Sequence, residues 1–230
     1  MNNGCLEQTV LYRLLEVLEV PDEQSSNGLE REIMQLFVNA DTDGVYFFES
    51  SEMKNRLQMF QPTCFNDLVL LLALQEGEAK VLFDRFISNK NGRHNHFPLS
   101  SLLDTTYGII LFDDQYTNVL EVCAGLDEYV IAKMRLAMRQ GQKTELAELI
   151  HVFADGCKRN SDFWQDGNFA QALVRRIWFD LIEQSPFLVN RQSIISRMQI
   201  SWKLAWMKLQ YPGLFEELRN GSGGESYGNN

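Results

Sequence analysis

Apolar residues recur every three or four positions along most of the chain, which is the spacing of one buried face of an α-helix. The first such run covers Leu6 to Val20 and ends at Pro21. By the same criterion we expect further helices over residues 29–38, 51–60, 65–74, 112–124, 127–140, 143–159, 166–184, 190–210 and 212–219. The pattern therefore predicts a mainly α, multi-helix fold.

Turn-forming residues separate these helical segments. Asp41-Thr42-Asp43-Gly44 predicts a turn that leads into a short extended piece over Val45–Phe48. Ser50 or Ser51 can cap the helix that follows, because a serine hydroxyl accepts a hydrogen bond from the first turn. Residues 88–98 are rich in Asn, Gly and His, which indicates a loop.

The end of the chain differs in composition from the rest. Residues 220–230 hold four glycines and no aliphatic side chain, so they have almost nothing to bury. We therefore expect a domain over residues 1–219 and a flexible, disordered C-terminal tail over 220–230.

Composition agrees with a folded chain. Of the 230 residues, 45% are hydrophobic and 23% are charged, which supplies a core and excludes a disordered protein. No apolar run reaches the roughly 18 residues of a membrane span, and no basic segment precedes an apolar one at the N-terminus, so we expect a cytoplasmic protein. The four cysteines stand singly, which predicts reduced, mostly buried thiols.

Charge is distributed unevenly along the sequence. Residues 1–130 hold 8 Lys and Arg against 21 Asp and Glu, whereas residues 131–219 hold 13 against 9. The densest cationic segment runs from Arg175 to Lys208, where only Asp180 and Glu183 oppose six cations. This asymmetry is a weak signal for an anionic partner, and the alternative is a helix face that lies against the acidic part of the same molecule.

Local motifs carry little chemistry on their own. Asp41–Gly44 resembles the start of a calcium loop, but the glycine and the ligand positions are misplaced for an EF-hand. Asp113 and Asp114 diverge by about 100° on a helix, so they suit its N-terminal dipole better than one metal ion. His94-x-His96 lacks further ligands, and we expect no metal site and no cofactor.

Trp202 and Trp206 lie one helical turn apart among lysines. Such a pair could stack bases, but it is more often the buried stripe of an amphipathic helix.

Five groups of residues attract attention by their order: Asp41–Met53; Gln61-Pro62-x-x-Phe65-x-Asp67-Leu68; Thr106–Phe112 with Gln115; Ala124-Gly125 with Arg135-x-Ala137-Met138; and Leu204-Ala205-x-x-Lys208-x-x-Tyr211-Pro212-x-x-Phe215. Together they resemble the fingers region of the bacterial replicative polymerase, the alpha subunit of DNA polymerase III. The resemblance extends from about residue 6 to 219. It implies a mainly helical fingers domain, which in the family closes over the incoming nucleotide and the template–primer.

Several charged positions depart from the family pattern. Its Arg-Pro-Gly-Pro reads Gln75-Glu76-Gly77-Glu78, and its Tyr-Gln-Glu-Gln reads Phe112-Asp113-Asp114-Gln115. Its Arg-Arg-Ala-Met-Gly keeps Arg135, Ala137 and Met138, and its Phe-Asn-Lys reads Val189-Asn190-Arg191. Residues 1–40 contain nothing like the palm aspartates that hold two metal ions for phosphoryl transfer. We therefore expect no polymerase activity from this chain alone.

The favoured function is a polymerase-inactive accessory protein of DNA replication or repair that binds DNA weakly. Its candidate DNA or nucleotide contacts are Arg135, Arg175, Arg176, Asn190, Arg191, Arg197, Lys203 and Lys208. One alternative is a protein-interaction module that binds a polymerase or repair assembly without nucleic acid. Another is a fingers subunit that complements a separately encoded palm.

Overall fold

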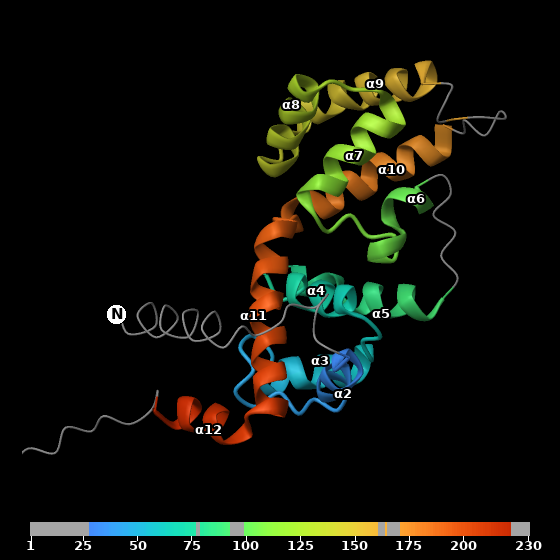
Figure 1. The fold of residues 1–230 in the computed structure, drawn as a ribbon. Helices are drawn as coiled ribbons and strands as arrows, with labels where there is room; N and C mark the ends of the chain where they lie inside the picture. Colours follow the sequence, from blue (N-terminus) through green and yellow to red (C-terminus); the bar gives the residue numbers. More distant parts are fainter. Residues whose placement is uncertain (1–27, 77–78, 93–98, 161–163, 165–170, 222–230) are drawn as a thin grey trace, which may run out of the picture. The chain divides into compact units, whose positions relative to one another are not determined.

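The computed structural model of the chain describes residues 28–76, 79–92, 99–160, 164 and 171–221. Helices dominate this part of the chain, which confirms the mainly α prediction (Figure 1). The helices are α2 Glu30–Val38, α3 Ser51–Phe60, α4 Phe65–Ala73, α5 Phe83–Asn91, α6 Ser100–Leu103, α7 Asp113–Ala124, α8 Glu128–Arg139, α9 Lys143–Arg159, α10 Gln171–Gln184, α11 Arg191–Gln210 and α12 Pro212–Gly221.

Some predictions fall outside the described residues. These are the helix over 6–20, Cys5, the two histidines at 94 and 96, the start of the helix expected from 166, and the tail from residue 222 onward. Residues 220 and 221 belong to α12, so the helix extends two residues beyond its expected end.

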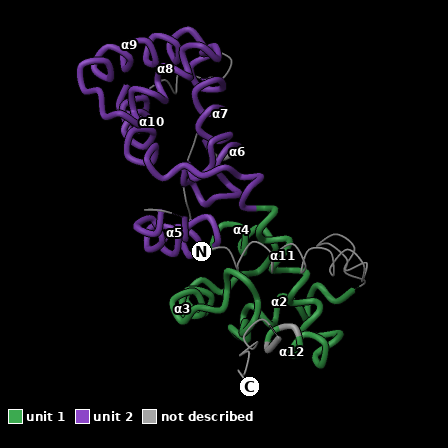
Figure 2. Tube along the Cα trace, turned by 90° about the vertical axis from the view of Figure 1, so that its left-hand side faces the viewer, with its two compact units in different colours: residues 1–71, 195–230 green, residues 72–194 purple. Residues whose placement is uncertain are grey.

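The chain divides into two compact units (Figure 2). Unit 1 comprises residues 1–71 and 195–230, and unit 2 comprises residues 72–194. The two boundaries fall within α4 and α11. The single domain expected over residues 1–219 stays a prediction.

Unit 1 has an aromatic core. The indole of Trp202, on α11, is 2% exposed and stacks on Phe37 of α2, with ring centroids 6.4 Å apart. Phe65 of α4 meets the same indole edge-on at 5.5 Å, and Phe48 meets Phe37 at 5.0 Å. Trp206, 8% exposed, is buried as well, so the tryptophan pair belongs to the buried stripe that its helical spacing favours.

The segment between α2 and α3 shows one correct and one wrong prediction. Ser50 caps α3, because its hydroxyl accepts a hydrogen bond from the Met53 amide at 3.2 Å. The extended piece expected over Val45–Phe48 is wrong, since Val45 N donates to Thr42 O and Phe48 N donates to Val45 O, which makes consecutive turns. A strand would place Val45 and Phe48 on opposite faces, whereas these turns bury both side chains.

Unit 2 is organised around α9, which packs against α7, α8 and α10. Phe153 of α9 lies 5.6 Å from Trp178 of α10 between ring centroids. The thiols of Cys123 and Cys157 are free and buried in this core, and burial raises the pKa of Cys157 to about 12. They are therefore unreactive packing groups. Cys64, in contrast, is exposed, so the prediction of burial is wrong for that cysteine.

The pattern missed the structure between α4 and α6. A 3-10 turn over Ala79–Leu82 continues into α5, so the loop expected from residue 88 is wrong up to residue 91. Two tertiary interactions explain the helix: Phe83 and Phe86 are buried, and Asn89 donates a 2.7 Å hydrogen bond to Tyr107 O. The Asn-rich composition favours a loop only when such contacts are ignored.

Gly156 permits the close approach of α9 to α7. A Cβ atom built at this glycine would lie 2.4 Å from the carbonyl oxygen of Ala124, which is backbone and cannot turn aside. We expect Gly156→Ala to destabilise the protein by about 1–3 kcal/mol, despite the helix propensity of alanine. The melting temperature should fall by roughly 3–10 °C, as measured by circular dichroism.

Gly213→Ala is the matched control. Gly213 is also helical, and a Cβ atom there would meet nothing within 4 Å. The control should melt within a degree or two of the parent chain. Equal melting of the two variants would contradict the packing role assigned to Gly156.

Candidate nucleic-acid interface

A buried loop precedes α7 and positions the first candidate residues. Residues Ile109 to Phe112 are at most 1% exposed, although they form no regular element. Buried backbone amides need partners, and two glutamine side chains supply them. Gln184 Oε1 accepts from Ile110 N at 2.6 Å, and Gln115 Oε1 accepts from Leu111 N and Phe112 N, each at 3.2 Å.

The same glutamine ties the loop to the turn before it. Gln115 Nε2 donates to Thr106 Oγ1 at 2.6 Å, and both side chains are buried. One amide group therefore satisfies two backbone donors and one hydroxyl at the start of α7.

A distant segment pairs with this loop in parallel. Val189 N donates to Leu111 O at 3.0 Å, and Asp113 N donates to Val189 O at 3.1 Å. This bridge brings the residues that lead into α11 beside the first turn of α7.

Two cations meet the acidic first turn of α7. Arg135 of α8 lies 2.6 Å from Asp113, and Arg191 of α11 lies 2.8 Å from Asp114. The Arg191 guanidinium also lies 4.0 Å from the centroid of the Phe112 ring. Because these groups are between 28% and 49% exposed, each pair contributes modestly to stability. Both arginines nevertheless form ion pairs with carboxylates of the same unit.

Asn190 has a structural role. Its side-chain oxygen accepts a hydrogen bond from Ser193 N at 2.9 Å, which caps the first turn of α11. The predicted contact with DNA or nucleotide at this residue stays a prediction.

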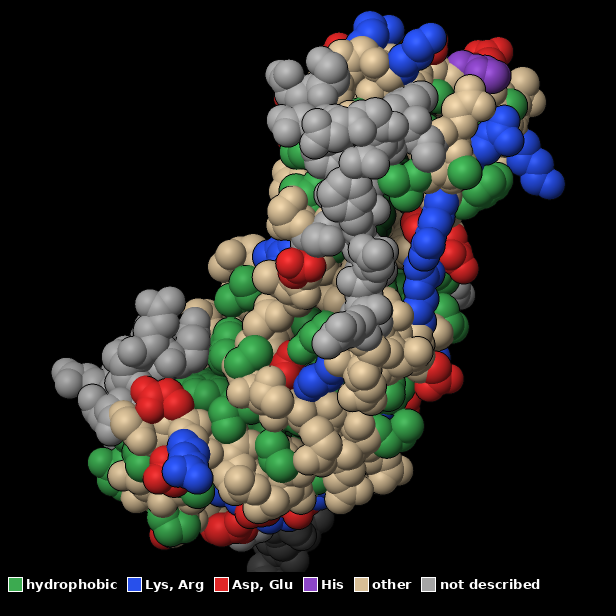
Figure 3. All heavy atoms as spheres, turned by 90° about the vertical axis from the view of Figure 1, so that its right-hand side faces the viewer, with side chains coloured by type: hydrophobic (Ala, Val, Ile, Leu, Met, Phe, Trp, Pro, Cys, Tyr) green, Lys and Arg blue, Asp and Glu red, His purple; other side chains and the backbone are tan. Residues whose placement is uncertain are grey.

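Arg175 and Arg176 lie exposed on α10. The two acids expected to oppose them, Asp180 and Glu183, instead pair with Arg85 of α5 at 3.2 and 3.3 Å. In the space-filling view, Lys and Arg side chains gather on the upper part of one face, with hydrophobic and acidic side chains between them (Figure 3).

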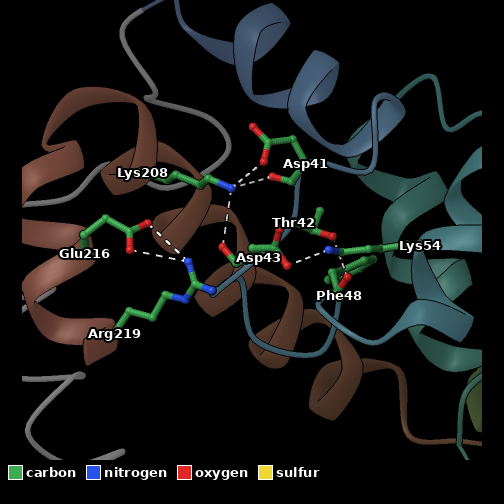
Figure 4. Close-up of polar contacts among 8 residues, drawn as sticks. All are labelled: Asp41, Thr42, Asp43, Phe48, Lys54, Lys208, Glu216 and Arg219. Carbon is green, nitrogen blue, oxygen red and sulfur yellow. Dashed lines mark hydrogen bonds and ion pairs between the residues drawn. The ribbon is translucent and has the colours of Figure 1, made fainter. Parts of the chain in front are cut away.

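The remaining candidates lie on the part of α11 that belongs to unit 1. Arg197 and Lys203 are partly exposed. Lys208 points toward the turn after α2, where its ammonium lies 2.7 Å from Asp41 Oδ1 and 2.9 Å from Asp41 O (Figure 4). The six cations of the segment from Arg175 to Lys208 are thus divided between the two units. Unit 2 contains Arg175, Arg176 and Arg191, and unit 1 contains Arg197, Lys203 and Lys208.

The turn that Lys208 holds is itself a polar cluster. Lys54 donates to Asp43 at 2.6 Å and holds the pKa of that carboxyl below its usual value of 3.8. The stabilisation from this pair is therefore present above pH 3.8 and is lost as the pH falls through the lowered pKa. Thr42 donates to Phe48 O, and Gly44, at φ +77°, faces the Phe215 ring, which lies 2.8 Å from the place of a Cβ atom.

The two acids of the segment that resembles a calcium loop, Asp41 and Asp43, thus form ion pairs with lysines (Figure 4). Within the described ranges, no three His, Cys, Asp or Glu side chains are grouped closely enough to hold a metal ion. No helix in the part of the chain that the structure describes is long and apolar enough to cross a membrane.

The sequence patterns did not reveal which cations are paired. Asp113 is 22 positions from Arg135, and Asp114 is 77 from Arg191. Nothing in the local sequence marks such pairs. The exposed ring of Phe179 was also missed, although its spacing of three and four residues from Arg176 and Arg175 is visible in the sequence.

The described structure is therefore mainly helical. Arg135, Arg191 and Lys208 each form an ion pair with an acid of their own unit. A family model described as the bacterial DNA polymerase III alpha subunit finger domain matches residues 19–161. The chain therefore belongs to this finger-domain family, and the resemblance predicted from the motifs is confirmed.

Curated relatives agree with this assignment. DNA polymerase III subunit alpha of Escherichia coli K12 is 29% identical over 219 residues, which cover 87% of this chain and 17% of that protein. The subunits of Vibrio cholerae and Pseudomonas aeruginosa are 29% and 28% identical over 217 and 239 residues, which cover 87% and 92% of this chain. The chain spans only 17% and 19% of those two proteins.

Gln115 provides a test of the loop. Gln115→Leu keeps a similar volume but leaves the amides of Leu111 and Phe112 without their acceptor. Because an unsatisfied buried donor costs about 1–3 kcal/mol, we expect a loss of roughly 2–4 kcal/mol in urea unfolding.

Gln210→Leu, at an exposed position, is the control and should change the unfolding free energy by less than about 0.5 kcal/mol. A Gln115→Leu chain as stable as this control would refute the role given to the buried amide.

Proposed function

We propose that this chain is a polymerase-inactive relative of the fingers domain that acts as an accessory protein in DNA replication or repair and binds DNA weakly. The finger-domain family supplies the replication context. The proposed lack of polymerase activity refers to these 230 residues by themselves.

The ion pair between Arg135 and Asp113 carries the proposal. Arg135 is an arginine that the family motif also has, whereas Asp113 stands where that motif has glutamine. The 2.6 Å pair therefore depends on the departure. A guanidinium held by a neighbouring carboxylate is a poorer partner for a phosphate, because binding must first separate the pair. The scaffold persists while one of its cations is neutralised, which suits a non-catalytic role.

Weak DNA binding has separate support. Unit 2 keeps exposed cations without a carboxylate partner among the described residues, including Arg175, Arg176, Lys158 and Arg159. Each phosphate that such a side chain neutralises releases a counterion, so binding falls with salt. The net charge of −10 opposes tight binding. Ordinary non-specific affinity, in the range of about 1–100 μM, is the expected result.

We expect no primer extension by the purified chain with Mg²⁺ or Mn²⁺, because these residues offer no palm-like pair of metal-binding aspartates. The measurement is extension of a labelled primer on a template at saturating nucleotide. Extension that a substitution in this chain abolishes, and that is therefore no contaminant, would overturn the non-catalytic proposal.

Restoring the family residue should release Arg135. We expect Asp113→Gln to tighten binding of a single-stranded or primed oligonucleotide about two- to fivefold at ~50 mM salt, where attraction is least screened. Fluorescence anisotropy measures the change.

Glu121→Gln is the matched control, because Glu121 is an exposed acid on the same helix for which no ion pair is recorded among the described residues. It removes the same charge without releasing an arginine, and it should change affinity less. An equal gain in oligonucleotide affinity in the two variants would show that the gain comes from the change in net charge and not from the release of Arg135. No DNA binding by the parent chain at ~50 mM salt would refute the DNA-binding proposal.

A protein-interaction module is the second candidate. Tyr129 is 80% exposed and Leu136 is 55% exposed, and they lie seven residues apart on one face of α8. Large apolar side chains on one exposed helix face are typical of a protein-binding surface. Association with a DNA polymerase III alpha subunit that Tyr129→Ala and Leu136→Ala weaken, with no DNA binding, would favour this function. Primer extension gained only on mixing with a palm-containing chain would favour a complementing fingers subunit.

A further inference from the structure

α10 presents two different faces. Its buried face carries Val174, Ile177, Trp178 and Leu181, which belong to the unit 2 core. The opposite face carries Arg175, Arg176 and Phe179, and the phenylalanine ring is 64% exposed.

Phe179 is not placed there by packing. Burying a phenylalanine side chain contributes about 1.5–3 kcal/mol relative to leaving it in water, and this ring makes little use of that contribution. Residues three and four apart on a helix are surface neighbours, so Arg175 and Arg176 share one helix face with Phe179. An exposed aromatic side chain on the same face as two exposed arginines is therefore a distinct surface feature of α10.

The acids on the same helix do not pair with these arginines. Asp180 and Glu183 both pair with Arg85, whose single positive charge compensates one of the two carboxylates. Within the described residues, no carboxylate pairs with Arg175 or Arg176. The face thus combines a flat apolar surface with two cations that have no ion-pair partner among the described residues.

We propose that Arg175, Arg176 and Phe179 form a binding site for single-stranded nucleic acid, in which the arginines contact phosphates and the ring stacks on an unpaired base. This inference rests on the proposed weak DNA binding and assigns it to α10. Stacking requires a base that is free of its duplex partner, so a single strand fits better than duplex DNA. Every base offers a flat face, so the site should show little sequence preference.

The stacking part is tested with two strands that share the same phosphates. Binding of a 15-nucleotide oligothymidine and of an abasic strand of equal length is measured by fluorescence anisotropy at ~50 mM salt. The parent chain should bind the strand with bases about fivefold tighter or more, since stacking on an aromatic side chain supplies that much per base. Phe179→Ala should lose this preference and keep its affinity for the abasic strand.

Phe179→Leu and Tyr129→Ala are the controls. The leucine variant keeps apolar area without an aromatic face, so it should also lose the preference. Tyr129 is an exposed aromatic side chain on α8, and its loss should leave the preference unchanged. An unchanged preference in Phe179→Ala overturns the site, because the ring then makes no contact with a base.

The cationic part is tested by salt dependence. Changing Arg175 and Arg176 to Gln should lower the slope of log affinity against log salt by about 1–2 units. Lys158 and Arg159 are a second adjacent, exposed pair in the same unit, and their Gln variants serve as the matched control. Equal losses of slope and affinity in the two double variants would overturn the site, because general electrostatic attraction would then explain the binding.

The possible failures are distinguishable. No binding of either strand at ~50 mM salt refutes the proposed DNA binding and this site with it. Binding that is insensitive to the α10 changes refutes the site alone. Binding of a polyglutamate peptide that depends on Phe179, with no binding of oligothymidine, would assign the face to an acidic protein segment instead.

Discussion

The need to satisfy buried backbone amides before α7 governs the arrangement of unit 2. Ile109 to Phe112 are buried without a helix or strand to pair their N–H groups. Ile109 N donates to Thr106 O, and two glutamine amides, from α7 and from the end of α10, accept the hydrogen bonds of the other three N–H groups. In a low-dielectric interior an unpaired donor is costly, so the loop, α7 and α10 hold one another in place.

The candidate interface follows from this buried loop. Once Phe112 is fixed, Asp113 and Asp114 open α7 at the surface, where Arg135 and Arg191 meet them. The Phe112 ring supports the Arg191 guanidinium from one side. Both arginines are therefore paired with carboxylates of the same unit at its surface. Among the described residues, Arg175 and Arg176 of α10 have no ion pair with a carboxylate.

Sequence patterns predicted the helices well where the buried face is continuous. α3 begins at its serine cap, and α9 has the expected bounds, because capping and periodicity act within a few residues. The patterns failed for α5, whose Asn-rich end is held by a hydrogen bond from Asn89 to Tyr107. They failed again over Val45–Phe48, where consecutive turns bury two side chains that a strand would separate.

The sequence by itself determined the mainly α class, most helix bounds, the buried tryptophan stripe and the family, because these depend on local spacing and on the order of motifs. Only the tertiary structure decided which cations form ion pairs with carboxylates. Arg191 reaches Asp114 across 77 positions, and Lys208 reaches Asp41 across 167. A charge count along the chain cannot distinguish a paired guanidinium from a free one, since pairing depends on which helices pack together. That packing leaves Arg175 and Arg176 beside Phe179 on α10 while it commits Arg135 and Arg191 to carboxylates.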